Sequence, residues 1–195
     1  MLRGLCVAAS AAALSVTVAA AANQPQFLGP TLKHPGTPPA FALRDQDGRL
    51  VRLASQRGKV TLVTFLYTHC PDLCPLTAQN LNSVLTSLGA KRQSVIVLAL
   101  SVDPSGDTRG AIDNFVRNHR LLPQFHYLTG TRRELEPIWK AYNVTPLRPN
   151  GPDPDHTLYT LVVDRSGQAR ILFDALARPP AILHDVRLLL ATTTS

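Results

Sequence analysis

The sequence contains very little sulfur. Its only methionine is Met1, and beyond residue 6 its only cysteines are Cys70 and Cys74. Without methionine in the body of the chain, a metal site built on a thioether is excluded. A single cysteine pair is also too little to staple a chain of 195 residues, which excludes a disulfide-rich scaffold. An apolar core must hold the protein together, and 45% hydrophobic residues suffice for one domain.

Clustered charge and internal repeats are also absent. The formal net charge is +7, but the basic residues are dispersed and no dense basic cluster is interleaved with aromatic residues. This pattern argues against nucleic acid as a partner. The positive charge is consistent with a solvated face, or with attraction to an acidic partner or an anionic membrane surface.

The first 40 residues have the composition of a targeting segment and a linker. Arg3 precedes an uncharged, alanine-rich stretch over residues 4–22, which ends in small residues that suit a signal peptidase. We expect residues 1–22 to be a signal peptide or, with residues 4–22 in the bilayer, a membrane anchor. Residues 23–40 are rich in proline and predict an extended linker. The predicted location is therefore the periplasm, either soluble or tethered to the inner membrane.

From residue 41 to residue 195 the pattern predicts one α/β domain. Segments 60–67 and 94–102 are near-continuous apolar and β-branched runs, typical of central parallel strands. The expected order is a hairpin at 41–53, then strand 60–67, a helix from Pro75 to about 88, strand 94–102, helix 108–118, strand 125–128, helix 131–142, strands 157–163 and 169–173, and helix 180–190. This order is that of a thioredoxin-like fold, with a central mixed sheet flanked by helices and an extra N-terminal β-hairpin.

The cysteine pair lies in Cys70-Pro71-Asp72-Leu73-Cys74-Pro75, directly after the first central strand. Cysteines four residues apart at a strand-to-helix junction can place both sulfurs on one face of the first helical turn. That geometry permits a disulfide or a two-thiolate metal site. The positive end of the helix predicts that both thiols are more acidic than free cysteine. A purely structural disulfide is disfavoured, because so short a loop removes little entropy from the unfolded chain.

Of the six histidines, His156 is the candidate ligand. It precedes a strand-like run at 158–164, so its imidazole is expected at the same sheet edge as the cysteines. Two soft sulfurs and one nitrogen suit copper, whereas a closed zinc site needs a fourth protein ligand that the sequence does not offer. His34, His119, His126 and His184 are expected on the surface without identified partners, and His69 on the opposite strand face.

Taken together, these motifs resemble the Sco/SenC family of copper-binding, thioredoxin-like proteins involved in cytochrome c oxidase assembly. The matching segments are 45–48, 58–60, 67–75, 101–104, 107–108, 128–131 and 155–157. The resemblance implies that Cys70, Cys74 and His156 bind one copper ion, as Cu(I) or Cu(II).

The resemblance further implies a role at the dinuclear copper centre of cytochrome c oxidase subunit II. One reading is a metallochaperone that delivers copper to that subunit. The alternative is a thiol–disulfide oxidoreductase that uses Cys70 and Cys74 as a redox pair to reduce the subunit's copper-ligand cysteines. A redox or copper sensor is a third and more distant possibility. The sequence does not identify the copper donor.

Overall fold

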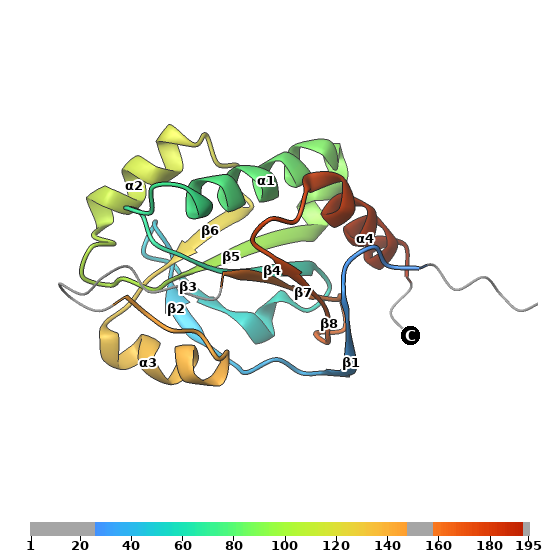
Figure 1. The fold of residues 1–195 in the computed structure, drawn as a ribbon, viewed down its shortest axis with the longest axis horizontal. Helices are drawn as coiled ribbons and strands as arrows, with labels where there is room; N and C mark the ends of the chain where they lie inside the picture. The colour runs from blue at the N-terminus through green and yellow to red at the C-terminus, as the bar shows by residue number, and fades with distance from the viewer. Residues whose placement is uncertain (1–25, 148–157, 193–195) are drawn as a thin grey trace, which may run out of the picture.

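A six-stranded mixed sheet crosses the molecule, in a computed structural model that describes residues 26–147 and 158–192 (Figure 1). The strand order is β1-β8-β7-β4-β5-β6. The strands are β1 (Thr31–Gly36), β4 (Val60–Leu66), β5 (Val95–Ser101), β6 (Phe125–Leu128), β7 (Tyr159–Val163) and β8 (Ala169–Asp174). In Figure 1 the helices α1, α2 and α4 lie above the sheet, and α3 lies below it with the hairpin β2–β3. The predicted thioredoxin-like α/β fold is confirmed.

The two central strands are buried along their whole length. All seven residues of β4 and all seven of β5 are buried, as expected for apolar, β-branched strands covered on both faces. The strands are parallel, so both end at the same sheet edge. Strand β7 runs antiparallel to β4 and therefore begins at that edge. Three loops, after β4, after β5 and before β7, thus meet at one end of the sheet.

Four helices complete the two outer layers: α1 (Leu73–Ser87), α2 (Arg109–Asn118), α3 (Arg132–Ala141) and α4 (Pro179–Ala191). Helix α3 begins with the capping box expected from its sequence: Glu134 N–H donates to Thr131 Oγ1, and Thr131 N–H donates to Glu134 Oε2. Helix α1 starts two residues before the predicted Pro75. Cys74 therefore lies inside its first turn and Cys70 just before it.

The described part of the predicted linker includes the edge strand β1, which pairs antiparallel with β8. Just before it, the backbone N–H groups of Leu28 and Gly29 each donate to the carboxylate of Asp185 on α4, at 2.8 Å. Asp185 is fully buried, and these two donors satisfy both of its oxygens. Residues 28–36 therefore belong to the folded domain. Sequence patterning missed this strand because its prolines and exposed side chains lack strand alternation.

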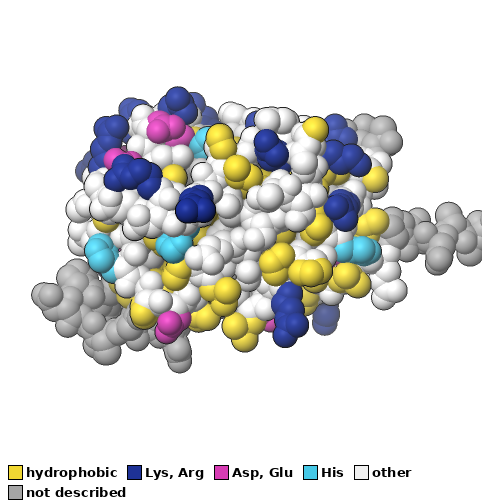
Figure 2. Space-filling model, turned by 90° about the horizontal axis from the view of Figure 1, so that it is seen from above, with side chains coloured by type: hydrophobic (Ala, Val, Ile, Leu, Met, Phe, Trp, Pro, Cys, Tyr) yellow, Lys and Arg dark blue, Asp and Glu magenta, His cyan; other side chains and the backbone are white. Residues whose placement is uncertain are grey.

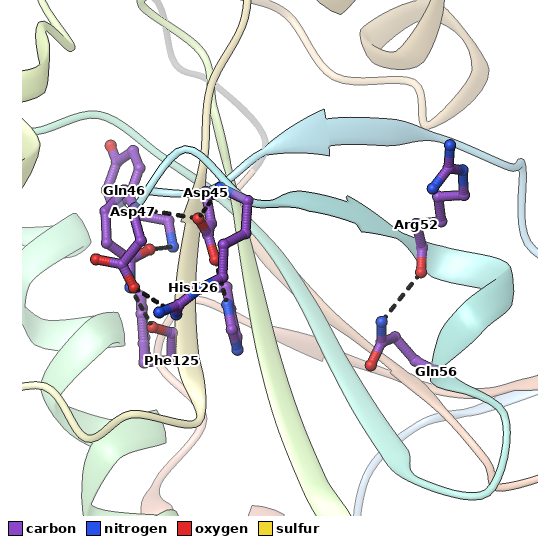
Figure 3. A network of polar contacts seen from close by, with 9 residues as sticks. Asp45, Gln46, Asp47, Arg52, Gln56, Phe125 and His126 are labelled. Atoms are coloured by element: carbon purple, nitrogen blue, oxygen red, sulfur yellow. Dashed lines mark hydrogen bonds and ion pairs between the residues drawn. The ribbon is translucent and has the colours of Figure 1, made fainter.

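The predicted N-terminal hairpin is present as β2 (Ala42–Arg44) and β3 (Leu50–Arg52). Its turn is bound to β6 by side chains, as Figure 3 shows. Tyr127 N–H donates to Gln46 Oε1 at 2.8 Å, and His126 Nδ1 lies 3.0 Å from Asp45 Oδ2. His126 therefore has a specific structural partner, 81 residues away, that the sequence did not indicate.

In the part of the chain that the structure describes, no helix combines the length and apolar character needed to cross a bilayer.

Candidate metal centre

The cysteine loop follows β4 and leads directly into α1. Cys70 is half-buried, and Cys74 is fully buried against the core. The backbone N–H of Cys74 donates to Cys70 Sγ at 3.2 Å, so the first sulfur sits over the amino end of the helix. The helix-capping residue Asp72 accepts no side-chain hydrogen bond there. The loop thus places two thiols within one helical turn, as the spacing predicted.

The prediction that both thiols are unusually acidic is wrong for Cys74. Burial raises the pKa of the Cys74 thiol far above its usual value, because a thiolate in the apolar core would lose its hydration. A hydrogen bond with the Tyr67 backbone acts in the opposite direction but is the smaller effect. Desolvation by the core therefore outweighs the helix dipole, and in the metal-free protein Cys74 is a neutral thiol at physiological pH.

This asymmetry predicts the order in which the thiols react. We expect iodoacetamide to alkylate Cys70 well before Cys74, since only thiolates react and Cys74 is both protonated and inaccessible. Peptide mass spectrometry of the metal-free, reduced chain after timed quenching measures both rates. Equal rates, or faster labelling of Cys74, would contradict the assigned burial. Denaturation in urea is the control, and there the two rates should converge.

A buried carboxylate supports the loop from the neighbouring strand. Asp107, which follows β5, is 3% exposed and accepts hydrogen bonds from three residues. The donors are Thr68 N–H at 2.7 Å, Ser101 Oγ at 2.6 Å and Tyr127 O–H at 3.0 Å. Thr68 lies two residues before Cys70, so Asp107 holds the start of the cysteine loop against β5 and β6.

The electrostatics of this carboxylate are set mainly by burial. Desolvation raises the pKa of Asp107, while the hydrogen bonds from Ser101, Thr68 and Tyr127 act to lower it. Burial, followed by the nearby Asp107 charge, raises the pKa of Tyr127 well above its usual value, so Tyr127 stays a hydrogen-bond donor. Beneath this cluster, Trp139 Nε1 donates to the Ser101 carbonyl at 2.9 Å.

The sequence placed Asp107 in a motif but assigned it no role. A polar signal does exist: Ser101 is the last residue of the buried strand β5, and Asp103 and Asp107 follow it, so all three come to the same sheet edge as the cysteines. Sequence spacing did not reveal that Asp107 turns inward, because its partner Tyr127 comes from another strand, 20 residues further along the chain.

The third predicted ligand, His156, lies outside the described residues. The strand that follows it starts at the cysteine end of the sheet: Thr160 pairs with Thr64 of β4, and Thr64 Oγ1 donates to the Tyr159 carbonyl at 2.9 Å. Leu158, two residues after His156, is buried.

The other described histidines are spread over several elements, and one of them, His69, directly precedes Cys70. His119 contacts Gln79 at 3.1 Å, His184 contacts Asp185 at 2.9 Å, and the exposed His34 lies on edge strand β1. His69 is exposed and contacts the Thr68 hydroxyl at 3.1 Å. Within residues 26–147 and 158–192, no three His, Cys, Asp or Glu side chains are grouped to hold a metal ion. The described residues thus offer two sulfurs to a metal ion at this site.

The donor set fits copper on its chemistry. Thiolate sulfur is a soft ligand that favours Cu(I), and the half-buried Cys70 opens the pair to the surface. Next to it, Leu73 and Leu76 on the first turns of α1 are 38% and 43% exposed. The sulfurs therefore lie beside an apolar surface on α1.

Comparison with known proteins agrees with this architecture. The chain is 27% identical over 135 residues to a SCO2-like protein of Rickettsia typhi, a match that covers 66% of each chain. Among solved structures, ScoI of Bradyrhizobium japonicum, which has copper bound, superposes with a TM-score of 0.67 at 30% identity, covering 78% of this chain and 98% of ScoI. The protein BsSco, described as having a disulfide switch and as a member of the Sco family of cytochrome c oxidase assembly proteins, gives 0.68 at 25% identity, covering 83% and 99%.

The family model described as SCO1/SenC matches residues 30–191, from the start of β1 to the last residue of α4. That range contains the whole sheet, all four helices and both thiols of the cysteine loop. The chain belongs to the SCO1/SenC family.

Proposed function

We propose that this protein binds one copper ion through Cys70, Cys74 and His156 and passes it to the dinuclear copper centre of cytochrome c oxidase subunit II. The observation that carries the proposal is the pair of thiols within one helical turn at the sheet edge where β7 begins. Copper bound in B. japonicum ScoI and the oxidase-assembly role of the family of BsSco support it. The matched region covers 66% of the length of the R. typhi relative. The activity of the whole protein therefore belongs to the proposal.

The protein's residues do three things in this mechanism. Cys70 and Cys74 supply sulfur, and loss of their protons accompanies metal binding. Asp107 holds the loop through Thr68 N–H. The exposure of Cys70 leaves one side from which a partner's ligands can take the metal. We further propose that the protein is exported and works in the periplasm, with residues 4–22 as signal or anchor.

Copper titration of two histidine variants tests the ligand set. The change is His156→Ala in the full, reduced chain, and we expect the copper affinity to fall by about 10-fold or more because one of three donors is lost. The control is His34→Ala on exposed edge strand β1, which should bind as wild type. Competition with a Cu(I) chelator measures both. Normal affinity of His156→Ala would remove this residue from the proposed site.

The unequal thiols favour a second candidate function, thiol–disulfide exchange. In it, the Cys70 thiolate attacks a partner's disulfide, forming a mixed disulfide and releasing one partner thiol. The Cys74 sulfur then displaces the second partner thiol, leaving a Cys70–Cys74 disulfide. Two electrons and both cysteine protons pass to the partner. A half-exposed attacking sulfur beside a buried, protonated one suits this order. Fast reduction of a subunit II peptide disulfide by the His156→Ala variant would favour it.

A further inference from the structure

A basic cavity lies at the end of the sheet opposite the cysteines. It measures about 210 Å³ and is lined by Lys91, Ser94, Arg165, Arg187, Leu190 and Ala191. Lys91 precedes β5, Arg165 lies in the β7–β8 turn, and Arg187 is on the last turns of α4. Because β4 and β5 have seven residues at about 3.3 Å each, roughly 20 Å separates this end from the cysteine loop.

The positive charge of this cavity is not neutralised by the described protein. None of Lys91, Arg165 and Arg187 forms an ion pair within the described ranges. Arg165 Nε donates to the Gly58 carbonyl at 3.1 Å, and Arg187 Nη2 to the Ser87 carbonyl at 3.4 Å. Both contacts orient the guanidinium groups without cancelling their charge.

Two acidic side chains close in sequence to the lining residues are already engaged. Asp164 pairs with Arg170 at 3.3 Å and accepts the N–H groups of Ser166 and Gln168. Asp185 accepts the N–H groups of Leu28 and Gly29 and contacts His184. Three cations that converge on one cavity, with no carboxylate paired to them among the described residues, make a site for an anion.

Further basic residues surround the same sheet end: Arg57 and Lys59 just before β4, and Arg92 beside Lys91. Figure 2, viewed from above, shows Lys and Arg side chains prevailing over Asp and Glu on the face that carries α1 and α4. The cysteine end carries charges of both signs, with Asp72 and Asp103 in its loops and Arg109, Arg132 and Arg133 at the starts of α2 and α3.

We propose that this cavity binds the phosphate group of an anionic phospholipid, so that this end of the sheet rests on a membrane and the cysteine loop at the opposite end faces away from it. The lining favours a lipid over another anion. Leu190 and Ala191 give the cavity an apolar side that suits an amphiphile. Basic side chains near an anionic membrane surface each add to binding.

Hydrogen–deuterium exchange of the full chain tests the proposal with nanodiscs of phosphatidylglycerol or phosphatidylcholine. We expect slower exchange around Lys91–Ser94, Arg165 and Arg187–Ala191 with phosphatidylglycerol only, and loss of this protection in high salt, which screens surface charges. The variant Lys91→Gln/Arg165→Gln/Arg187→Gln should lose the protection. Its control, Arg109→Gln/Arg117→Gln/Lys140→Gln, removes the same charge from α2 and α3 and should keep it. The Lys91 side chain forms no hydrogen bond among the described residues, so the single variant Lys91→Glu tests the site should the triple variant unfold.

Three outcomes would overturn the proposal. Equal protection by both lipids would show that charge does not matter. Protection by inorganic phosphate alone, without an effect of phosphatidylglycerol, would indicate a site for a free anion. Protection by poly-glutamate but not by lipid would indicate an acidic protein partner. Copper titration of the same triple variant should match wild type, so failure here is distinguishable from failure of the proposed copper function.

Discussion

Replacing either Cys70 or Cys74 by serine is expected to weaken copper binding by more than about 100-fold. The reason is the softness of the donor: a hydroxyl oxygen binds Cu(I) poorly, and even loss of an outer-shell partner commonly costs 10- to 100-fold in metal affinity. Competition with a Cu(I) chelator measures the change in the reduced, full-length chain. Retention of tight binding by either variant would show that the metal is held elsewhere.

The two serine variants should differ in stability although they agree in copper affinity. At Cys70 a serine oxygen can still accept the N–H of residue 74, so we expect a free energy of unfolding close to wild type. At Cys74 the hydroxyl enters the core, where burial of a polar group costs about 1–3 kcal/mol. Urea unfolding measures the free energy of unfolding of the two serine variants, with Ser87→Ala on the exposed surface of α1 as the control. The comparison separates the loss of a copper ligand from the loss of the fold.

Asp107→Asn is expected to lower the free energy of unfolding by about 2–4 kcal/mol. Three donors converge on the carboxylate, from Thr68, Ser101 and Tyr127. An amide offers only one oxygen, and its NH₂ group would face a donor, which leaves buried polar groups unsatisfied. Because Thr68 precedes the cysteine loop, this variant should also show faster hydrogen exchange over residues 68–70. The matched control is Asp113→Asn on α2.

The effect of Asp107→Asn should depend on pH in a defined direction. Burial raises the folded-state pKa of Asp107 above its ordinary 3.8, so the folded protein binds this proton more tightly than the unfolded chain. The stability that the folded protein gains by binding this proton is fully present at pH values below 3.8. It is lost as the pH rises through the raised folded-state pKa of Asp107. The stability difference between wild type and Asp107→Asn should therefore be largest in acid and smaller at neutral pH. A difference that grows with pH would contradict this assignment.

Much of the fold could be predicted from local sequence. Strands β4 and β5 were predicted from their apolar, β-branched residues, and the start of α3 from the capping box of Thr131 and Glu134. Each of these signals lies within a few consecutive residues. The two cysteines were placed correctly at a strand-to-helix junction because their spacing and the strand before them are local features. Strand β1 was not foreseen, because its stability comes from pairing with β8, more than 130 residues later.

The sequence by itself determined the layered α/β architecture and the proximity of the two sulfurs, because periodicity, turn residues and short spacings act over a few positions. Only the tertiary structure decided which thiol is buried and that Asp107 is enclosed by Thr68, Ser101 and Tyr127. It also decided that the uncompensated cations meet at the opposite end of the sheet. Desolvation and charge pairing depend on atoms brought together from distant parts of the chain, so the helix-end argument alone predicted the wrong pKa direction for Cys74.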